Sequence, residues 1–133
     1  MSRKAARDSA FKIIYQTPFH TAESGLDVMD IFLAEEGSEK LTAGDLEYIK
    51  QIVNNCFENL EIIDETLSNS LKNWTLGRIS KVNLAILRLS LCEIKYGEIP
   101  FQVSINEAVE LAKKYSDDEA PAFVNGVLAD VIK

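Results

Sequence analysis

The sequence predicts an all-α protein of about six or seven helices. Apolar residues recur at three- and four-residue spacing along most of the 133-residue chain, and no stretch alternates with period two for long. Apolar residues make up 47% and charged residues 26% of the chain, which is typical of a globular protein with one sizeable core. Because the length is that of one domain, we expect a single domain over residues 1–133.

The N-terminal part predicts two helices. The first is expected over residues 3–17, because its apolar residues form one stripe and Pro18 interrupts the pattern. This stripe consists of Ala6, Ala10, Ile13 and Ile14. A second, shorter helix is expected over about residues 25–36 and ends at Gly37.

The middle of the chain predicts a long helical stretch followed by a buried helix. Thr42 and Asp45 form a helix-start signature, and the apolar pattern that follows is so long that we expect a break near Asn59. Residues 80–96 are apolar on nearly every side, which indicates a central helix buried among its neighbours. Gly97 and Pro100 are expected to close it.

Two more helices are expected at the C-terminal end. Ser104 and Glu107 have the spacing of a capping box, which predicts a helix from Ser104 to about Tyr115. The last helix is expected over about residues 119–132. Gly126 lies inside it, and because glycine weakens a helix, we expect another helix or a ligand to approach closely there.

Charge is unevenly distributed. The chain has 14 basic and 21 acidic residues, a net charge of −7, which argues against a general polyanion binder. Residues 1–12 nevertheless hold four basic residues and one acid, a local net charge of +3, against −10 for the remainder. A cationic end therefore sits on an acidic body.

The sequence contains no recognisable catalytic or metal-binding constellation. Nucleotide-binding, metalloprotease and serine-hydrolase motifs are absent, and His20 is the one histidine. Cys56 and Cys92 lie in apolar helical stretches, so we expect buried thiols rather than a disulfide or zinc site. We therefore expect a binding protein without enzymatic activity, cofactor or metal.

No run reaches the roughly 18 apolar residues of a membrane helix, and no signal peptide is visible, so we expect a cytoplasmic protein with no membrane partner.

Arg88 is an unusual charge within the apolar central helix. It is expected either to pair with an acid from another helix or to contact a ligand, and pairing is favoured because an unpaired buried charge is costly.

Three stretches resemble the NusB family of bacterial transcription antitermination factors. They are RKAAR at 3–7 with IYQ at 14–16, NWTLGRI at 73–79 with AILRL at 85–89 and Glu93, and IPFQVSINEAVELAKKY at 99–115 with FVNGVL at 123–128. The C-terminal pair of motifs is the most specific, and the resemblance spans nearly the whole chain in the right order.

The resemblance implies a fold of two small helical bundles packed together, and no catalytic activity. Family members bind boxA-like RNA of ribosomal RNA leader transcripts together with NusE, a small-subunit ribosomal protein. That complex joins other Nus factors and RNA polymerase and suppresses premature termination in ribosomal RNA operons. The resemblance also leaves open a homodimer, which would be autoinhibitory if it covered the basic first helix.

The resemblance also implies candidate site residues. Arg3 and Arg7 are one i,i+4 step apart on the first helix with Lys4 beside them, and we expect these three to bind RNA phosphates and bases. Phe123 is implied near the RNA path, although a core aromatic fits its spacing equally well. Tyr15 matches a position near the NusE interface, although it could instead be a half-buried tyrosine of the first helix's stripe.

Two alternatives to the antitermination interpretation remain at this stage. The same helical module resembles the N-terminal domain of ribosomal RNA cytosine methyltransferases, which need a further domain for S-adenosylmethionine. A helical adaptor that never touches RNA is the other alternative.

Many relatives have a denser arginine cluster at the start of the chain than this protein has. We therefore expect weaker RNA binding and greater dependence on NusE here.

Overall fold

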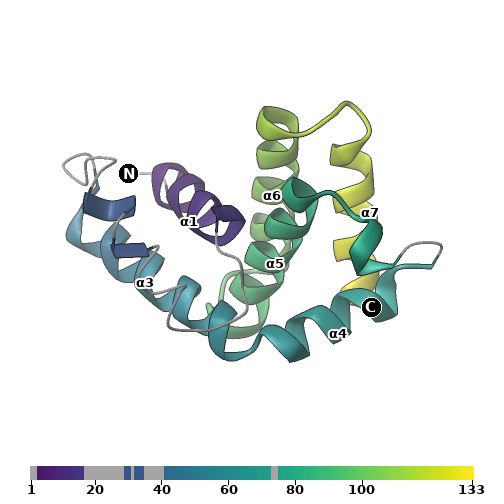
Figure 1. The fold of residues 1–133 in the computed structure, drawn as a ribbon, viewed down its shortest axis with the longest axis horizontal. Helices are drawn as coiled ribbons and strands as arrows, with labels where there is room; N and C mark the ends of the chain where they lie inside the picture. The colour runs from purple at the N-terminus through teal and green to yellow at the C-terminus, as the bar shows by residue number, and fades with distance from the viewer. Residues whose placement is uncertain (1–2, 17–28, 31, 35–40, 73–74) are drawn as a thin grey trace.

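The computed structural model describes residues 3–16, 29–30, 32–34, 41–72 and 75–133. Within these ranges the chain is helical and contains no strand, which confirms the all-α prediction (Figure 1). The elements are α1 (Lys4–Gln16), α3 (Ala43–Glu58), α4 (Leu60–Ser70), the 3-10 helix η2 (Leu76–Arg78), α5 (Lys81–Tyr96), α6 (Phe101–Tyr115) and α7 (Ala120–Val131).

The helices form two groups that share α5. On one side α1 and α3 pack against each other and against α5, and on the other side α4, α6 and α7 pack with α5. Figure 1 shows α5 standing between α1 and α3 on one side and α7 on the other. This arrangement confirms the expected pair of packed helical bundles.

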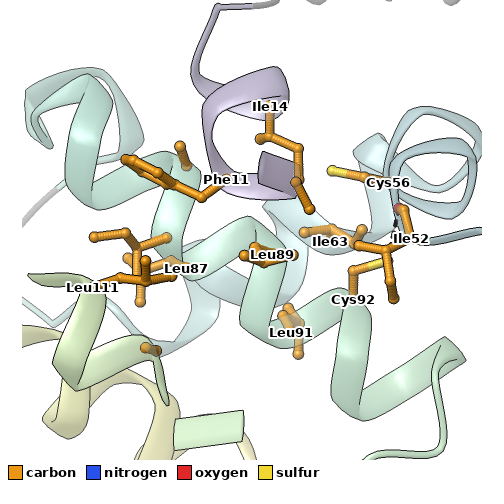
Figure 2. Close-up of a cluster of buried hydrophobic side chains, with 14 of the residues drawn as sticks. Phe11, Ile14, Ile52, Cys56, Ile63, Leu87, Leu89, Leu91, Cys92 and Leu111 are labelled. Atoms are coloured by element: carbon orange, nitrogen blue, oxygen red, sulfur yellow. Dashed lines mark hydrogen bonds between the residues drawn. The ribbon is translucent and has the colours of Figure 1, made fainter. Parts of the chain in front are cut away.

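The core is built around α5, as the sequence predicts. Eight of its residues are buried, including Leu87, Leu89 and Leu91. Figure 2 shows side chains of α1, α3, α4 and α6 gathered around these leucines. Each fully buried leucine contributes about 1.5–3 kcal/mol relative to an exposed one, so this helix holds the two groups together.

Cys56 and Cys92 are fully buried in this core, which confirms the sequence interpretation (Figure 2). Cys92 donates its thiol hydrogen to the carbonyl oxygen of Ile52 at 3.5 Å. Burial raises the pKa of Cys56 to about 12 and also raises the pKa of Cys92. Both side chains therefore remain neutral thiols that pack as small hydrophobes.

The boundaries around α3 agree with the sequence prediction. Thr42 and Asp45 form a reciprocal capping box, in which the Asp45 amide donates to Thr42 Oγ1 at 3.0 Å. Asn59 ends α3 and directly precedes α4, so the expected break lies where it was predicted.

The end of α5 is tightly packed around Gly97. A Cβ atom on Gly97 would lie 3.0 Å from the carbonyl oxygen of Glu93 and 3.2 Å from Cδ1 of Ile52. The next residue, Glu98, has a φ of 56°, which turns the chain towards α6. Gly97 therefore closes the helix, as expected.

The predicted start of α6 is wrong. The helix begins at Phe101, directly after Pro100, and Ser104 lies inside its first turns. The Ser104 side chain is fully buried against α5 and caps no helix. The capping-box pattern fails here because Ser104 faces the core and Glu107 lies near Arg7 instead of the helix start.

Arg88 forms the structural ion pair that was favoured. Its Nε and Nη2 atoms donate to the two carboxylate oxygens of Asp64 at 2.9 and 2.8 Å, which joins α5 to α4.

Some of the sequence predictions concern residues outside the described ranges. These are Pro18, His20, Gly37 and Trp74, together with most of the helix expected over residues 25–36. Its described residues, 29–30 and 32–34, are helical.

Candidate nucleic-acid interface

The cationic start of the chain lies at the N-terminus of α1, beside the N-terminus of α3. Arg3 precedes α1, and its side chain is 42% exposed. Its guanidinium donates to the carbonyl oxygen of Gly44 at 3.1 Å, lies 3.5 Å from Asp45 Oδ1 and stacks over the ring of Tyr48 at 4.9 Å. These contacts hold Arg3 in a fixed position while leaving part of its side chain open to solvent.

Lys4 is exposed at the first residue of α1. Among the described residues it forms no ion pair. An exposed ammonium group is a suitable donor to an anion such as a phosphate.

The sequence interpretation required Arg3 and Arg7 to share a solvated face of α1. The structure shows that they do not. Only 7% of the residue is exposed, and its Nε donates to Glu93 Oε2 at 2.7 Å. Its Nη1 lies 3.9 Å from Glu107 Oε1. The spacing prediction fails because position 7 belongs to the face of α1 that packs on α5 and α6, whereas Arg3 reaches outward from before the helix.

Glu93 lies at the centre of a buried polar network that joins four helices. It is 1% exposed and accepts hydrogen bonds from Arg7 of α1, Tyr48 of α3 and Ser104 of α6, the last at 2.8 Å. Ser104 Oγ also lies 2.8 Å from Ser90 Oγ. Burial and the neighbouring Glu93 carboxylate raise the pKa of Tyr48, so its hydroxyl stays protonated as a donor.

This network satisfies a charge pair that would otherwise be costly in the core. The described residues contain no buried side-chain nitrogen or oxygen without a hydrogen-bond partner. Because Tyr48 also lies under the guanidinium of Arg3, the buried network is directly connected to the surface arginine. The sequence carried no signal for this connection, since Arg7 and Glu93 are 86 positions apart.

Asp8 organises a second polar cluster further along α1. Its carboxylate accepts a hydrogen bond from the Tyr115 hydroxyl at 2.5 Å and lies 3.1 Å from the ammonium of Lys12 and 3.2 Å from that of Lys114. Although burial opposes ionisation, the hydrogen bonds from Tyr115, Lys12 and Lys114 lower the pKa of Asp8. This cluster joins α1 to the C-terminal end of α6.

Tyr15 and Phe123, the two aromatic candidates, occupy different parts of the molecule. Tyr15 is 45% exposed at the end of α1, and its ring stacks on Phe11 at a centroid distance of 6.1 Å. Phe123 is half-buried on α7 and packs against the core. Figure 1 shows α5 and α6 between α1 and α7, so the structure does not bring Phe123 together with Arg3 and Lys4.

No other helix approaches Gly126 closely in the described part of the chain, contrary to one of the two sequence expectations. It is exposed, and a Cβ atom at this position would meet nothing within 4 Å. Gly126 and Phe123 instead line an open pocket of about 380 Å³ between α7 and the C-terminal end of α4. Packing within the described part of the chain therefore does not explain the glycine, and the ligand alternative remains.

Comparison with known proteins resolves the family. The profile of the NusB family matches residues 4–133. The chain belongs to the NusB family. A Ruminiclostridium cellulolyticum protein described as "Transcription antitermination protein NusB" is 44% identical over 134 residues, which cover 100% of this chain and 90% of that protein. The protein of the same description from Acetivibrio thermocellus is 45% identical, also over 134 residues, with the same coverage.

Solved structures of NusB share this fold. The structure of T. maritima NusB is 30% identical, has a TM-score of 0.87, and the match covers 98% of this chain and 90% of that one. A crystal structure of the antitermination factors NusB and NusE in complex with dsRNA contains a chain 28% identical to this one, with a TM-score of 0.85. That match covers 97% of this chain and 94% of the other.

The NusB relatives favour one of the interpretations left open by the sequence. The two relatives compared above are described as antitermination proteins, and the match covers 90% of the length of each. This favours the antitermination interpretation over the methyltransferase-domain alternative. In the described ranges no helix is long and apolar enough to cross a membrane. The same ranges contain no group of three or more potential metal-ligating side chains.

Proposed function

We propose that this protein is a non-enzymatic transcription antitermination factor that binds boxA-like RNA together with NusE. In this proposal the complex joins other Nus factors and RNA polymerase in the cytoplasm and promotes processive transcription of ribosomal RNA operons. The observation that carries the proposal is the similarity, over 97% of the chain, to a NusB chain whose crystal structure contains NusE and dsRNA.

The charge distribution supports the RNA part of this proposal. An acidic body repels RNA over most of its surface, so binding is confined to the region where cations are exposed. Arg3 and Lys4 provide such a region, and the contacts of Arg3 with Gly44 and Tyr48 pre-organise it. Arg7 takes part indirectly, because its ion pair with Glu93 anchors the first turns of α1.

The two aromatic residues have separate roles in the proposal. The partly exposed ring of Tyr15 provides a NusE contact at the far end of α1. Phe123, beside the pocket at Gly126, provides an aromatic edge for an RNA base. A single-stranded RNA long enough to reach both Arg3 and Phe123 has to cross α5 or α6, which stand between them (Figure 1).

The test is fluorescence anisotropy with a boxA-like single-stranded oligonucleotide, in the absence and presence of NusE. A scrambled single strand and a double-stranded form of the same sequence serve as controls, since the related complex contains dsRNA. We expect the boxA-like single strand to bind more tightly than both controls, and more tightly again with NusE. Equal binding of all three RNAs, or no binding with NusE present, would contradict the proposal.

The same measurement separates the proposal from the adaptor alternative. An adaptor without RNA affinity binds NusE while leaving the anisotropy of every oligonucleotide unchanged. Sedimentation of the protein alone determines whether a homodimer forms, and RNA that dissociates such a dimer would indicate that the dimer covers the RNA surface.

A further inference from the structure

A groove of about 750 Å³ runs between α1 and α6. Its apolar lining is provided by Leu111 of α6 together with Phe32, Leu33 and Leu41. Phe32 and Leu111 are buried, whereas the side chains of Lys113 and Lys114 along the groove are exposed to solvent. Lys4 also lines the groove, which connects the groove to the RNA surface proposed above.

The charge of the groove is opposite to that of the protein. Five basic and three acidic side chains line it, a net charge of +2, or +1 when Arg7 is left out because its charge is paired with Glu93, whereas the whole chain carries −7. Arg7 is buried against Glu93, so the accessible cations are four lysines. These are Lys4, Lys12, Lys113 and Lys114.

The lysines on the two walls face a common solvent space. The side chains of Lys113 and Lys114 are 60% and 63% exposed at the C-terminal end of α6, and that of Lys12 is 40% exposed on α1. The negative end of the α6 dipole favours lysines there without neutralising them fully. Flexible exposed ammonium groups at several points along a groove match the repeated phosphates of a nucleic-acid backbone.

Asp8 limits the charge that the groove offers. Its one carboxylate lies within 3.2 Å of both Lys12 and Lys114, so the two ammonium groups share a single counter-ion across the groove. Glu110 lies 3.9 Å from Lys113, but this is an exposed i,i+3 pair of the kind that contributes little. A phosphate therefore has to compete mainly with Asp8.

We propose that the RNA backbone continues from Lys4 along the groove between α1 and α6, with Lys12, Lys113 and Lys114 as phosphate ligands and Asp8 as a competing anion. This inference rests on the proposed function and extends it beyond the N-terminus of α1. It also gives a physical reason for the weak RNA binding that the sequence predicts for the protein alone, since Asp8 already pairs with two of the cations.

The test compares RNA affinity and its salt dependence for three forms of the protein. The first variant, Lys113→Gln with Lys114→Gln, removes two exposed charges while retaining long polar side chains. The matched control, Arg78→Ala with Lys95→Ala, removes two cations that lie outside the groove. We expect the first variant to bind RNA more weakly and to flatten the slope of log affinity against log salt by roughly 1.4, and the control to behave as wild type.

The variant Asp8→Asn tests the competing anion in the opposite direction. Asparagine retains an acceptor for the Tyr115 hydroxyl but no longer neutralises Lys12 and Lys114. We expect RNA to bind the Asp8→Asn variant severalfold more tightly than it binds the wild-type protein. Unchanged or weaker binding by this variant, with its fold intact by circular dichroism, would overturn the role of Asp8.

Two results would overturn the groove proposal alone, and a third would instead mark a failure of the proposed function. If wild type binds RNA and the Lys113 and Lys114 double variant has the same affinity and slope, the groove is not part of the RNA path. If that variant loses NusE affinity alone, the groove is a protein-docking surface. If wild type with NusE binds no RNA, the proposed function itself is wrong.

Discussion

Arg7 of α1 and Glu93 of α5 form a buried ion pair at 2.7 Å. The pair is connected to the partly exposed Arg3 through Tyr48, whose hydroxyl donates to Glu93 and whose ring lies under the Arg3 guanidinium. The cationic start of the chain is therefore anchored to the core by one buried charge and presents another to solvent.

The first prediction concerns the buried pair itself. Arg7→Met leaves the Glu93 carboxylate buried without its cation, and we expect a loss of about 3–5 kcal/mol in the free energy of unfolding. Adding Glu93→Gln removes the uncompensated charge while retaining an acceptor for Tyr48, so the double variant should recover part of that loss. Urea unfolding measures both, and a loss below about 1 kcal/mol for Arg7→Met would contradict the buried geometry.

The second prediction concerns Ser104. Because this side chain donates to buried Glu93, Ser104→Ala should cost about 1–3 kcal/mol, with the helix content unchanged. Thr42→Ala is the matched comparison, since Thr42 is a true N-cap and its loss should cost about 1 kcal/mol. A double-mutant cycle with Ser90→Ala should show coupling between the two serines, and strictly additive losses would contradict their contact.

The third prediction concerns Gly126. Since a Cβ atom there meets nothing within 4 Å, Gly126→Ala should stabilise α7 by about 0.5–1 kcal/mol. Thermal unfolding measures the gain. If the same variant weakens RNA binding, the glycine serves the ligand, whereas a destabilised variant would contradict the open surface described here.

The fourth prediction concerns pH and Asp8. An acid whose pKa is lower in the folded protein stabilises the fold above its ordinary pKa, and that contribution disappears as the pH falls through the folded value. The pKa of Asp8 is lowered from an ordinary value of 3.8, so wild type should be more stable than Asp8→Asn at neutral pH. The difference should shrink progressively below about pH 3.8, and a difference that stays constant with pH would show that the ionised carboxylate contributes nothing.

The helices could be predicted from the sequence because their apolar periodicity is local. The buried helix α5 and the break at Asn59 follow from spacing alone. The same kind of capping pattern, however, was right at Thr42 and wrong at Ser104. A local pattern does not reveal that Pro100 starts the helix earlier and that the serine faces another helix.

The candidate site could be predicted only in part, for a related reason. The cations of the candidate site are visible in the sequence, whereas the partners of those cations are not. Arg7 finds Glu93 at a separation of 86 positions, and Lys114 finds Asp8 at a separation of 106. Which cations face solvent is therefore decided by tertiary packing.

The most direct test of the central claim is a salt titration of boxA-like RNA binding in the presence of NusE. The variant Arg3→Ala with Lys4→Ala is compared with Arg78→Ala with Lys95→Ala, which also removes one arginine and one lysine. We predict that the first variant binds more weakly and lowers the slope of log affinity against log salt by roughly 1.4, while the second matches wild type. Equal affinities and equal slopes for all three proteins would show that the N-terminus of α1 is not where this protein holds RNA.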